Sequence, residues 1–132
     1  MRILILSLCL GGVSAPVAAA PPAVAEGELI RQLVAALKDS DADVRANLAQ
    51  ALAKIGPPAV DPLIEALDDA LPERRGGAAY ALGLLGPLGK PSLSKLLELL
   101  DDKDTEVRRQ ASQAIHRVLP TSRPPAKPTG GQ

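Results

Sequence analysis

Apolar residues in this chain recur at intervals of three and four positions, which is the spacing of one face of an α-helix. Two short runs have this spacing: Leu29, Ile30, Leu33, Val34 and Leu37, and then Val60, Leu63, Ile64 and Leu67. A longer helical pattern follows each short run, over about residues 43–55 and 73–85, and a third lies at 105–119. The pattern therefore predicts pairs of helices, in each of which a short helix precedes a longer one.

The residues at the ends of the longer segments support these boundaries. Side chains that can accept hydrogen bonds from the first N–H groups of a helix stand before two of them: Asp41, and either Asp104 or Thr105. The remaining long segment has Pro72 there, which is tolerated in a first helical turn. Glycine followed by proline, at residues 56–57 and 86–87, is typical of the end of a helix.

The helical pairs are copies of one unit. Residues 33–56 align without a gap with residues 63–86, so that Leu33 corresponds to Leu63. Residues 96–119 form a third copy of the same pattern. One such pair cannot bury its own apolar face, whereas stacked copies share a continuous core. We therefore predict an all-α fold.

The predicted architecture is an α-solenoid of three tandem helical hairpins. Its units cover about residues 28–57, 58–87 and 88–119 and are called the first, second and third repeats below. Together they form a predicted domain over residues 26–119. Residues 120–132 are rich in proline and glycine and lack apolar periodicity, which is typical of a disordered tail.

The second helices carry the most specific pattern. DADVRANLAQALAKIG (residues 41–56) and DTEVRRQASQAIHRVL (104–119) resemble HEAT repeats, specifically the short HEAT-like repeats of the phycobilisome-lyase type. The middle copy (71–86) departs from that pattern by carrying Arg74 where Val is usual. The resemblance covers about residues 29–119 and implies that recurring Asp and Arg residues form hydrogen-bonded ladders between repeats. These residues are Asp39, Asp69, Asp102, Arg45, Arg75 and Arg108.

The N-terminal segment, residues 1–25, has the order of a secretory signal peptide: the cation Arg2, an apolar run, and then small residues. We expect cleavage after Ala25, and we interpret Cys9 as part of the signal rather than as a lipidation site. The apolar run is too short to span a bilayer, which needs about 20 residues. We therefore expect an exported protein, periplasmic or secreted, without stable membrane insertion after cleavage. A membrane tether formed by an uncleaved signal is the alternative.

Charge and aromatic content argue against nucleic-acid binding. The chain has 15 Lys and Arg residues against 15 Asp and Glu residues, with no Trp or Phe and a single Tyr, Tyr80. A nucleic-acid surface usually needs a basic excess, and base stacking needs aromatic side chains. We therefore expect protein partners and no nucleic acid.

The sequence also contains no motif for a catalytic or metal-binding site. His116 is the single histidine, whereas a metal or nucleophile site needs several converging groups. The acidic runs at 39–43 and 101–106 lack the glycine and the late bidentate Glu of a calcium loop. We therefore predict a protein that is not an enzyme and has no cofactor or metal.

The function expected from these features is a protein–protein interaction module or scaffold. The second helices of a solenoid line one face, and the three copies differ most at positions expected to point outward there. These candidate binding residues are Asn47, Gln50, Lys54, Gly77, Tyr80, Leu84, Gln110, Gln113 and Arg117. Tyr80 is either a surface anchor or a packing residue. An accessory subunit of a lyase or protein-modification system is the alternative function, and the open ends of the stack would permit end-to-end self-association.

Overall fold

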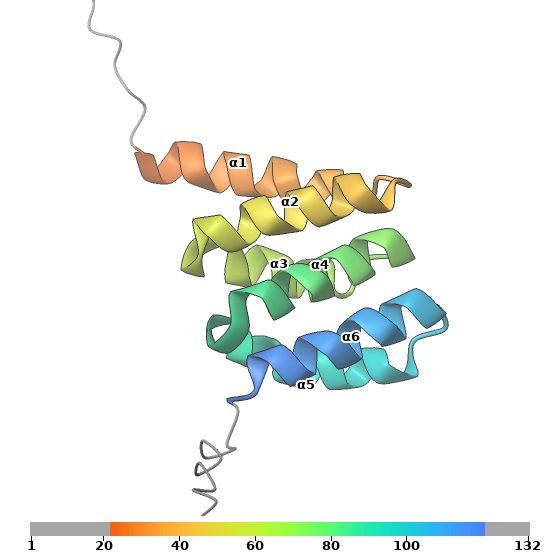
Figure 1. The fold of residues 1–132 in the computed structure, drawn as a ribbon. Helices are drawn as coiled ribbons and strands as arrows, with labels where there is room; N and C mark the ends of the chain where they lie inside the picture. Colours follow the sequence, from red (N-terminus) through yellow and green to blue (C-terminus); the bar gives the residue numbers. More distant parts are fainter. Residues whose placement is uncertain (1–21, 121–132) are drawn as a thin grey trace, which may run out of the picture.

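Three stacked helical hairpins make up residues 22–120, the part of the chain that the computed structural model describes (Figure 1). The α-helices are α1 (Pro22–Ala36), α2 (Ala42–Ile55), α3 (Val60–Ala66), α4 (Pro72–Leu85), α5 (Leu93–Glu98) and α6 (Thr105–Val118). Short 3-10 helices lie at Pro57–Ala59, Gly86–Ser92 and Leu99–Asp101. No strand occurs within residues 22–120. The predicted all-α solenoid of three hairpins is confirmed.

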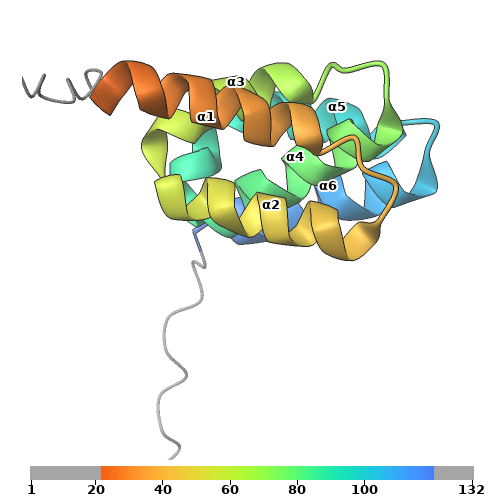
Figure 2. The ribbon, with the colours of Figure 1, turned by 90° about the horizontal axis from the view of Figure 1, so that it is seen from above.

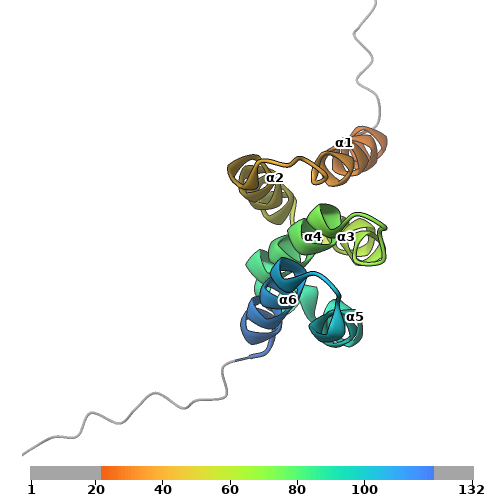
Figure 3. The same cartoon turned by 90° about the vertical axis from the view of Figure 1, so that its right-hand side faces the viewer.

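The hairpins form two layers. Viewed along the helices, α1, α3 and α5 lie in one layer and α2, α4 and α6 in the other (Figure 3). The view from above shows the same division, with α1 and α2 uppermost (Figure 2). Helix α4 is central in the second layer and packs against both α2 and α6. We call the outer side of α2, α4 and α6 the second-helix face.

The ends of the second helices follow from their capping residues. Asp41 accepts hydrogen bonds from the backbone N–H groups of Asp43 and Val44 at 2.8 and 3.3 Å. Asp104 caps α6 in the same way, so that Thr105 is its first helical residue rather than its cap. Helix α4 has no side-chain cap and begins at Pro72. The predicted Asp caps and the predicted proline start are therefore confirmed.

Glycines close two of the second helices. Gly56 and Gly86 follow α2 and α4 with φ values of 85° and 59°, a region that side chains with a Cβ rarely adopt. Their amides donate back to the carbonyl oxygens of Leu52 and Gly83. The predicted glycine–proline helix ends are confirmed.

The core is aliphatic and lies between the two layers. Its largest fully buried apolar side chains are Ile30, Leu37, Leu52, Leu63, Leu67, Leu82, Leu96, Val107 and Val118. Small residues let α4 approach its neighbours closely. A Cβ added to Gly77 would lie only 3.1 Å from Leu37 Cδ2. Gly77 is buried, so the prediction that it points outward is wrong.

Several predictions from the sequence concern the two ends of the chain. Residues 1–21, most of the predicted signal peptide, and residues 121–132, most of the predicted tail, lie outside the described residues. Helix α1 begins at Pro22, so the expected cleavage after Ala25 falls in its first turn. Among residues 22–120, no helix is both long and apolar enough to cross a membrane. Export and cleavage stay predictions.

Candidate functional site

One Asp–Arg ion pair joins adjacent repeats, as the resemblance to HEAT-like repeats implies. Arg75 donates from Nε and Nη2 to Asp102 Oδ2 and Oδ1 at 2.8 and 2.9 Å. The two side chains are only 17% and 9% exposed. The hydrogen bond from Arg75 lowers the pKa of Asp102 below its ordinary value, against the effect of desolvation. This bidentate pair ties the second repeat to the third.

The other residues of the predicted ladder bond within their own repeats. Arg45 donates from Nη1 to the carbonyl oxygens of Asp39 and Ser40 at 2.7 and 2.9 Å. Arg108 makes the equivalent pair of bonds to its own turn. The Asp39 carboxylate accepts from the N–H of Asp41. For Asp39, Arg45 and Arg108 the prediction of hydrogen bonds between repeats is therefore wrong, since each braces the turn between its own two helices.

Asp69 forms a hydrogen bond with Arg74 of its own repeat instead of the predicted bond between repeats. Asp69 Oδ2 accepts from Arg74 Nη1, five residues on, while Asp69 Oδ1 accepts from the N–H of Leu71 at 2.9 Å. The bond from Leu71 lowers the pKa of Asp69, and Arg74 lowers it further. Arg74 also donates from Nη2 to the carbonyl oxygen of Ala35 in α1 at 3.1 Å. The inter-repeat link here is therefore Arg74 to Ala35, and the prediction that Asp69 pairs between repeats is wrong.

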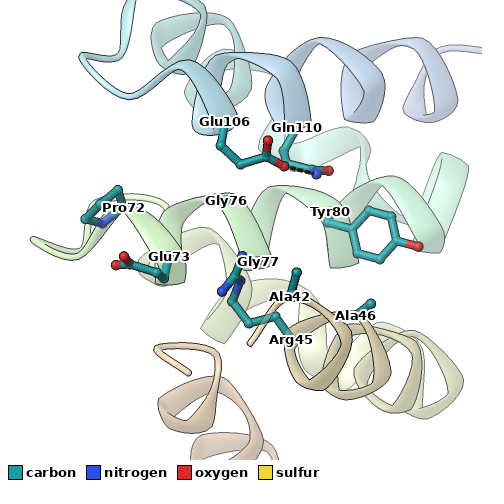
Figure 4. Close-up of a pocket in the computed structure, with 10 residues that line it drawn as sticks. All are labelled: Ala42, Arg45, Ala46, Pro72, Glu73, Gly76, Gly77, Tyr80, Glu106 and Gln110. Atoms are coloured by element: carbon teal, nitrogen blue, oxygen red, sulfur yellow. Dashed lines mark hydrogen bonds between the residues drawn. The ribbon is translucent and has the colours of Figure 1, made fainter. Parts of the chain in front are cut away.

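A groove of about 260 Å³ opens on the second-helix face between α2, α4 and α6 (Figure 4). It is lined by Ala42, Arg45 and Ala46 from α2, by Pro72, Glu73, Gly76, Gly77 and Tyr80 from α4, and by Glu106 and Gln110 from α6. Gly76 and Gly77 leave the floor without side chains. The equivalent residues of the third repeat are Arg109 and Gln110, so the groove exists because two large side chains are replaced by glycine.

Two polar groups in the groove have no hydrogen-bond partner within residues 22–120. Nε and Nη2 of Arg45 make no bond there, although Nη1 is fully engaged. Gln110 donates from Nε2 to Glu106 Oε1 at 2.6 Å, which orients the amide, and its buried Oε1 has no partner. The groove therefore offers a charged donor from Arg45, whereas the Gln110 oxygen is buried out of reach of a partner.

Tyr80 combines the two alternatives that the sequence left open. Its ring is half-buried and packs against the core, yet it also lines the groove. The guanidinium carbon of Arg117, an exposed predicted binding residue, lies 5.7 Å from the ring centroid, within the range of a cation–π contact. Tyr80 thus packs with one side and is accessible from the groove.

The remaining predicted binding residues lie on α2, α4 and α6 around the groove. Asn47, Gln50, Lys54, Leu84 and Gln113 are exposed. Sequence reasoning missed the charged lining residues Arg45, Glu73 and Glu106 as groove residues. The glycine pair at 76–77 is the sequence signal that could have identified them, because two adjacent residues without side chains leave space beside them.

Groups suited to catalysis do not converge in the described part of the chain. His116 is exposed near the end of α6. Among residues 22–120, no group of three or more His, Cys, Asp or Glu side chains could hold a metal ion.

The comparison with protein families gives one match. A model that describes HEAT repeats matches residues 30–116, which is most of the described helices. No curated protein matches the chain.

Proposed function

Because this chain belongs to the HEAT-repeat family, we propose that it is an exported, non-catalytic interaction module that binds a protein partner through the second-helix face. HEAT repeats commonly mediate protein–protein interactions, and a solenoid offers its partner an extended surface. The observation that carries the choice of face is the groove between α2, α4 and α6, whose glycine floor is recessed between neighbouring helices.

The surroundings of the groove support this choice. Interfaces gain most of their affinity from a few aromatic and Arg residues in partly enclosed positions. Tyr80 and Arg117 form such a pair on this face, and exposed polar residues such as Gln50 and Gln113 surround it. In contrast, the pocket between α1 and α3 on the other layer is lined by Arg74 and Asp69, which already bond each other.

Site-specific photo-crosslinking in native envelope or secretome fractions tests the proposal. A photoreactive residue at Gln50 or Gln113 should trap a partner, because both positions are exposed beside the groove. The matched controls are Glu65 on α3 and Ser94 on α5, which are exposed on the other layer. Partner crosslinks from Glu65 and Ser94 alone would assign binding to that layer and reject the second-helix face.

The proposal also covers the type of system in which the module acts and its location. An accessory subunit of a lyase or protein-modification system would dock through the same face, in keeping with the resemblance to repeats of the phycobilisome-lyase type. Secretory export, to a periplasm or to the medium, rests on residues 1–25 of the sequence. Retention of an uncleaved signal would leave the module tethered to the membrane, and N-terminal sequencing of the native protein distinguishes the two.

A second candidate, end-to-end self-association, is supported by the two open ends of the stack. Leu100 in the third repeat is 38% exposed, whereas the equivalent Leu67 is 1% exposed. At the other end, Val44 is 40% exposed and the equivalent Val107 is fully buried. Stacking a second copy would bury both kinds of residue. Sedimentation should then show concentration-dependent assembly that Leu100→Glu abolishes, and a monomer at all concentrations would reject this candidate.

A further inference from the structure

We propose that Arg45 is the docking point for a carboxylate of the protein partner, an Asp or Glu side chain that enters the groove and binds the Nε–Nη2 edge of the guanidinium. This inference rests on the proposed function and names the chemistry that the partner presents. The internal repeats of the chain supply the argument, because one repeat holds the bound form of the same arrangement.

Arg45 is oriented by its own turn in the same way as Arg75. Its Nη1 donates to the carbonyl oxygens of Asp39 and Ser40 at 2.7 and 2.9 Å. Nη1 of Arg75 donates to the two equivalent carbonyl oxygens of its turn at 2.9 and 3.0 Å. The guanidinium is therefore held before any partner arrives, which reduces the entropy cost of binding.

The second repeat shows what the remaining edge of such an arginine binds. Nε and Nη2 of Arg75 hold both oxygens of Asp102, the bidentate geometry for which a planar guanidinium is suited. The same two nitrogens of Arg45 have no partner within residues 22–120. Asp69, which stands where Asp102 does, is bonded to Arg74 instead. The first repeat thus holds an arginine of the same pose that lacks its carboxylate.

The groove gives a partner access to this edge. Arg45 lines it, and Figure 4 shows the guanidinium directed from α2 toward Gly77 on α4, which has no side chain of its own. The Glu73 carboxylate points away from Arg45, toward the side of Pro72 (Figure 4). It makes no ion pair within the described residues, so it leaves the charge of Arg45 available.

The second repeat favours a carboxylate over a phosphate as the occupant, because the equivalent edge of Arg75 binds the two oxygens of the Asp102 carboxylate. Glu73 and Glu106 also line the groove, and they add negative charge near an incoming anion. An Asp or Glu side chain of the partner would therefore complete at Arg45 the arrangement that Asp102 completes at Arg75.

Titration of the full-length, ¹⁵N-labelled protein with acetate tests the proposal without knowledge of the partner. The Nε–Hε resonances of Arg45, Arg31 and Arg109 are followed at constant ionic strength, with Arg45→Gln used for assignment. Arg31 and Arg109 are exposed arginines that already pair with Glu28 and Glu106, and they serve as controls for a guanidinium whose carboxylate partner is present. We expect Arg45 to saturate at an acetate concentration at least about tenfold lower than theirs, a difference of about 1.4 kcal/mol.

Two further probes identify the chemistry. The peptide acetyl-Gly-Asp-Gly-amide should shift the Arg45 resonance, and acetyl-Gly-Asn-Gly-amide should not. Inorganic phosphate should require a higher concentration than acetate. The proposal is overturned if Arg45 responds at the same acetate concentration as the exposed arginines, or if phosphate binds it more tightly than acetate does.

The outcome can be separated from that of the proposed function. If crosslinks at Gln50 and Gln113 trap a partner but Arg45→Lys leaves its affinity unchanged and acetate does not bind, the carboxylate inference fails and the proposed face stands. If Arg45 binds acetate and the Asp peptide but the face traps no protein, the proposed function fails. If both hold, Arg45→Lys, which keeps the charge but loses the fork, should weaken partner binding by at least about tenfold.

Discussion

The two interfaces between repeats differ although the repeats share one sequence pattern. Between the second and third repeats, Arg75 and Asp102 form a buried bidentate pair, and Gly83 lies close enough to α6 that an added Cβ would be 3.0 Å from Ala114 Cα. Between the first and second repeats, Arg74 donates to the carbonyl oxygen of Ala35, and Nε and Nη2 of Arg45 have no partner within residues 22–120. The Asp–Arg pairing is therefore complete at the second interface and incomplete at the first, and we infer that this pairing serves stability at the second interface and binding at the first.

Removal of core side chains should give the largest difference between the two interfaces. Leu52 and Leu82 occupy equivalent positions and are both fully buried. Leu82→Ala should lower the free energy of unfolding by about 2–5 kcal/mol, the usual cost of such a cavity. Leu52→Ala should lie at the lower end of that range, because α2 packs within its own hairpin and against α4 only, whereas α4 has a neighbour on each side.

Urea denaturation of the two variants measures this difference, and the removed volume is identical in both. An equal or larger loss for Leu52→Ala would show that the first interface is packed as tightly as the second.

Removal of one carboxylate charge should have the next largest effect. Asp102→Asn should destabilise the protein by about 1.5–3 kcal/mol, since hydrogen bonds to charged groups contribute about that much. Asp69→Asn should cost less, because its partner Arg74 keeps a bond to the carbonyl oxygen of Ala35. Chemical denaturation of both variants at neutral pH provides the measurement, and equal losses would contradict the division between a complete and an incomplete Asp–Arg pairing.

The pH dependence of stability should follow from the same two carboxylates. The pKa values of Asp102 and Asp69 are lowered in the folded protein from the ordinary value of 3.8. A lowered pKa contributes stability above the unfolded value that is lost as pH falls through the folded one. Unfolding free energy should therefore decrease below about pH 4, and Asp102→Asn should flatten that decrease more than Asp69→Asn. A decrease of unchanged steepness in Asp102→Asn would assign the effect to other groups.

Most of the fold could be predicted from the sequence because the signals that determine it are local. The Asp41 and Asp104 caps, the Gly56 and Gly86 helix ends and the apolar spacing each act within one helix or turn. Alignment of the copies then predicts the stacking, since equivalent residues need equivalent neighbours. The all-α solenoid follows from these two steps.

The groove could not be predicted in the same way because it depends on which of several possible hydrogen bonds forms. Both Arg45 and Arg74 could bind the carboxylate of Asp69, and the three-dimensional structure shows that Arg74 does. Gly77 was aligned with outward positions of the other copies, but the close approach of α4 to Leu37 turns that position inward. Alignment of repeats thus identifies which residues are equivalent, whereas the spacing between helices decides which of them are free to bind.

Two glycines of α4 that both face α6 test how closely the second interface is packed along its length. Replacing glycine by alanine within a helix gains about 1 kcal/mol in helix propensity. At Gly76 the added Cβ would lie 3.8 Å from Val107 Cγ2, an ordinary contact, so Gly76→Ala should stabilise the protein by about 0.5–1 kcal/mol. At Gly83 the Cβ would meet the α6 backbone at 3.0 Å, and overpacking costs about 1–3 kcal/mol. Gly83→Ala should therefore be neutral to destabilising by about 2 kcal/mol once the propensity gain is subtracted. Because about 1 kcal/mol shifts the melting temperature of a domain this size by about 4–8 °C, calorimetry can resolve the difference between the two variants. Equal stabilisation by both substitutions would show that the second interface has room for an added methyl group at Gly83.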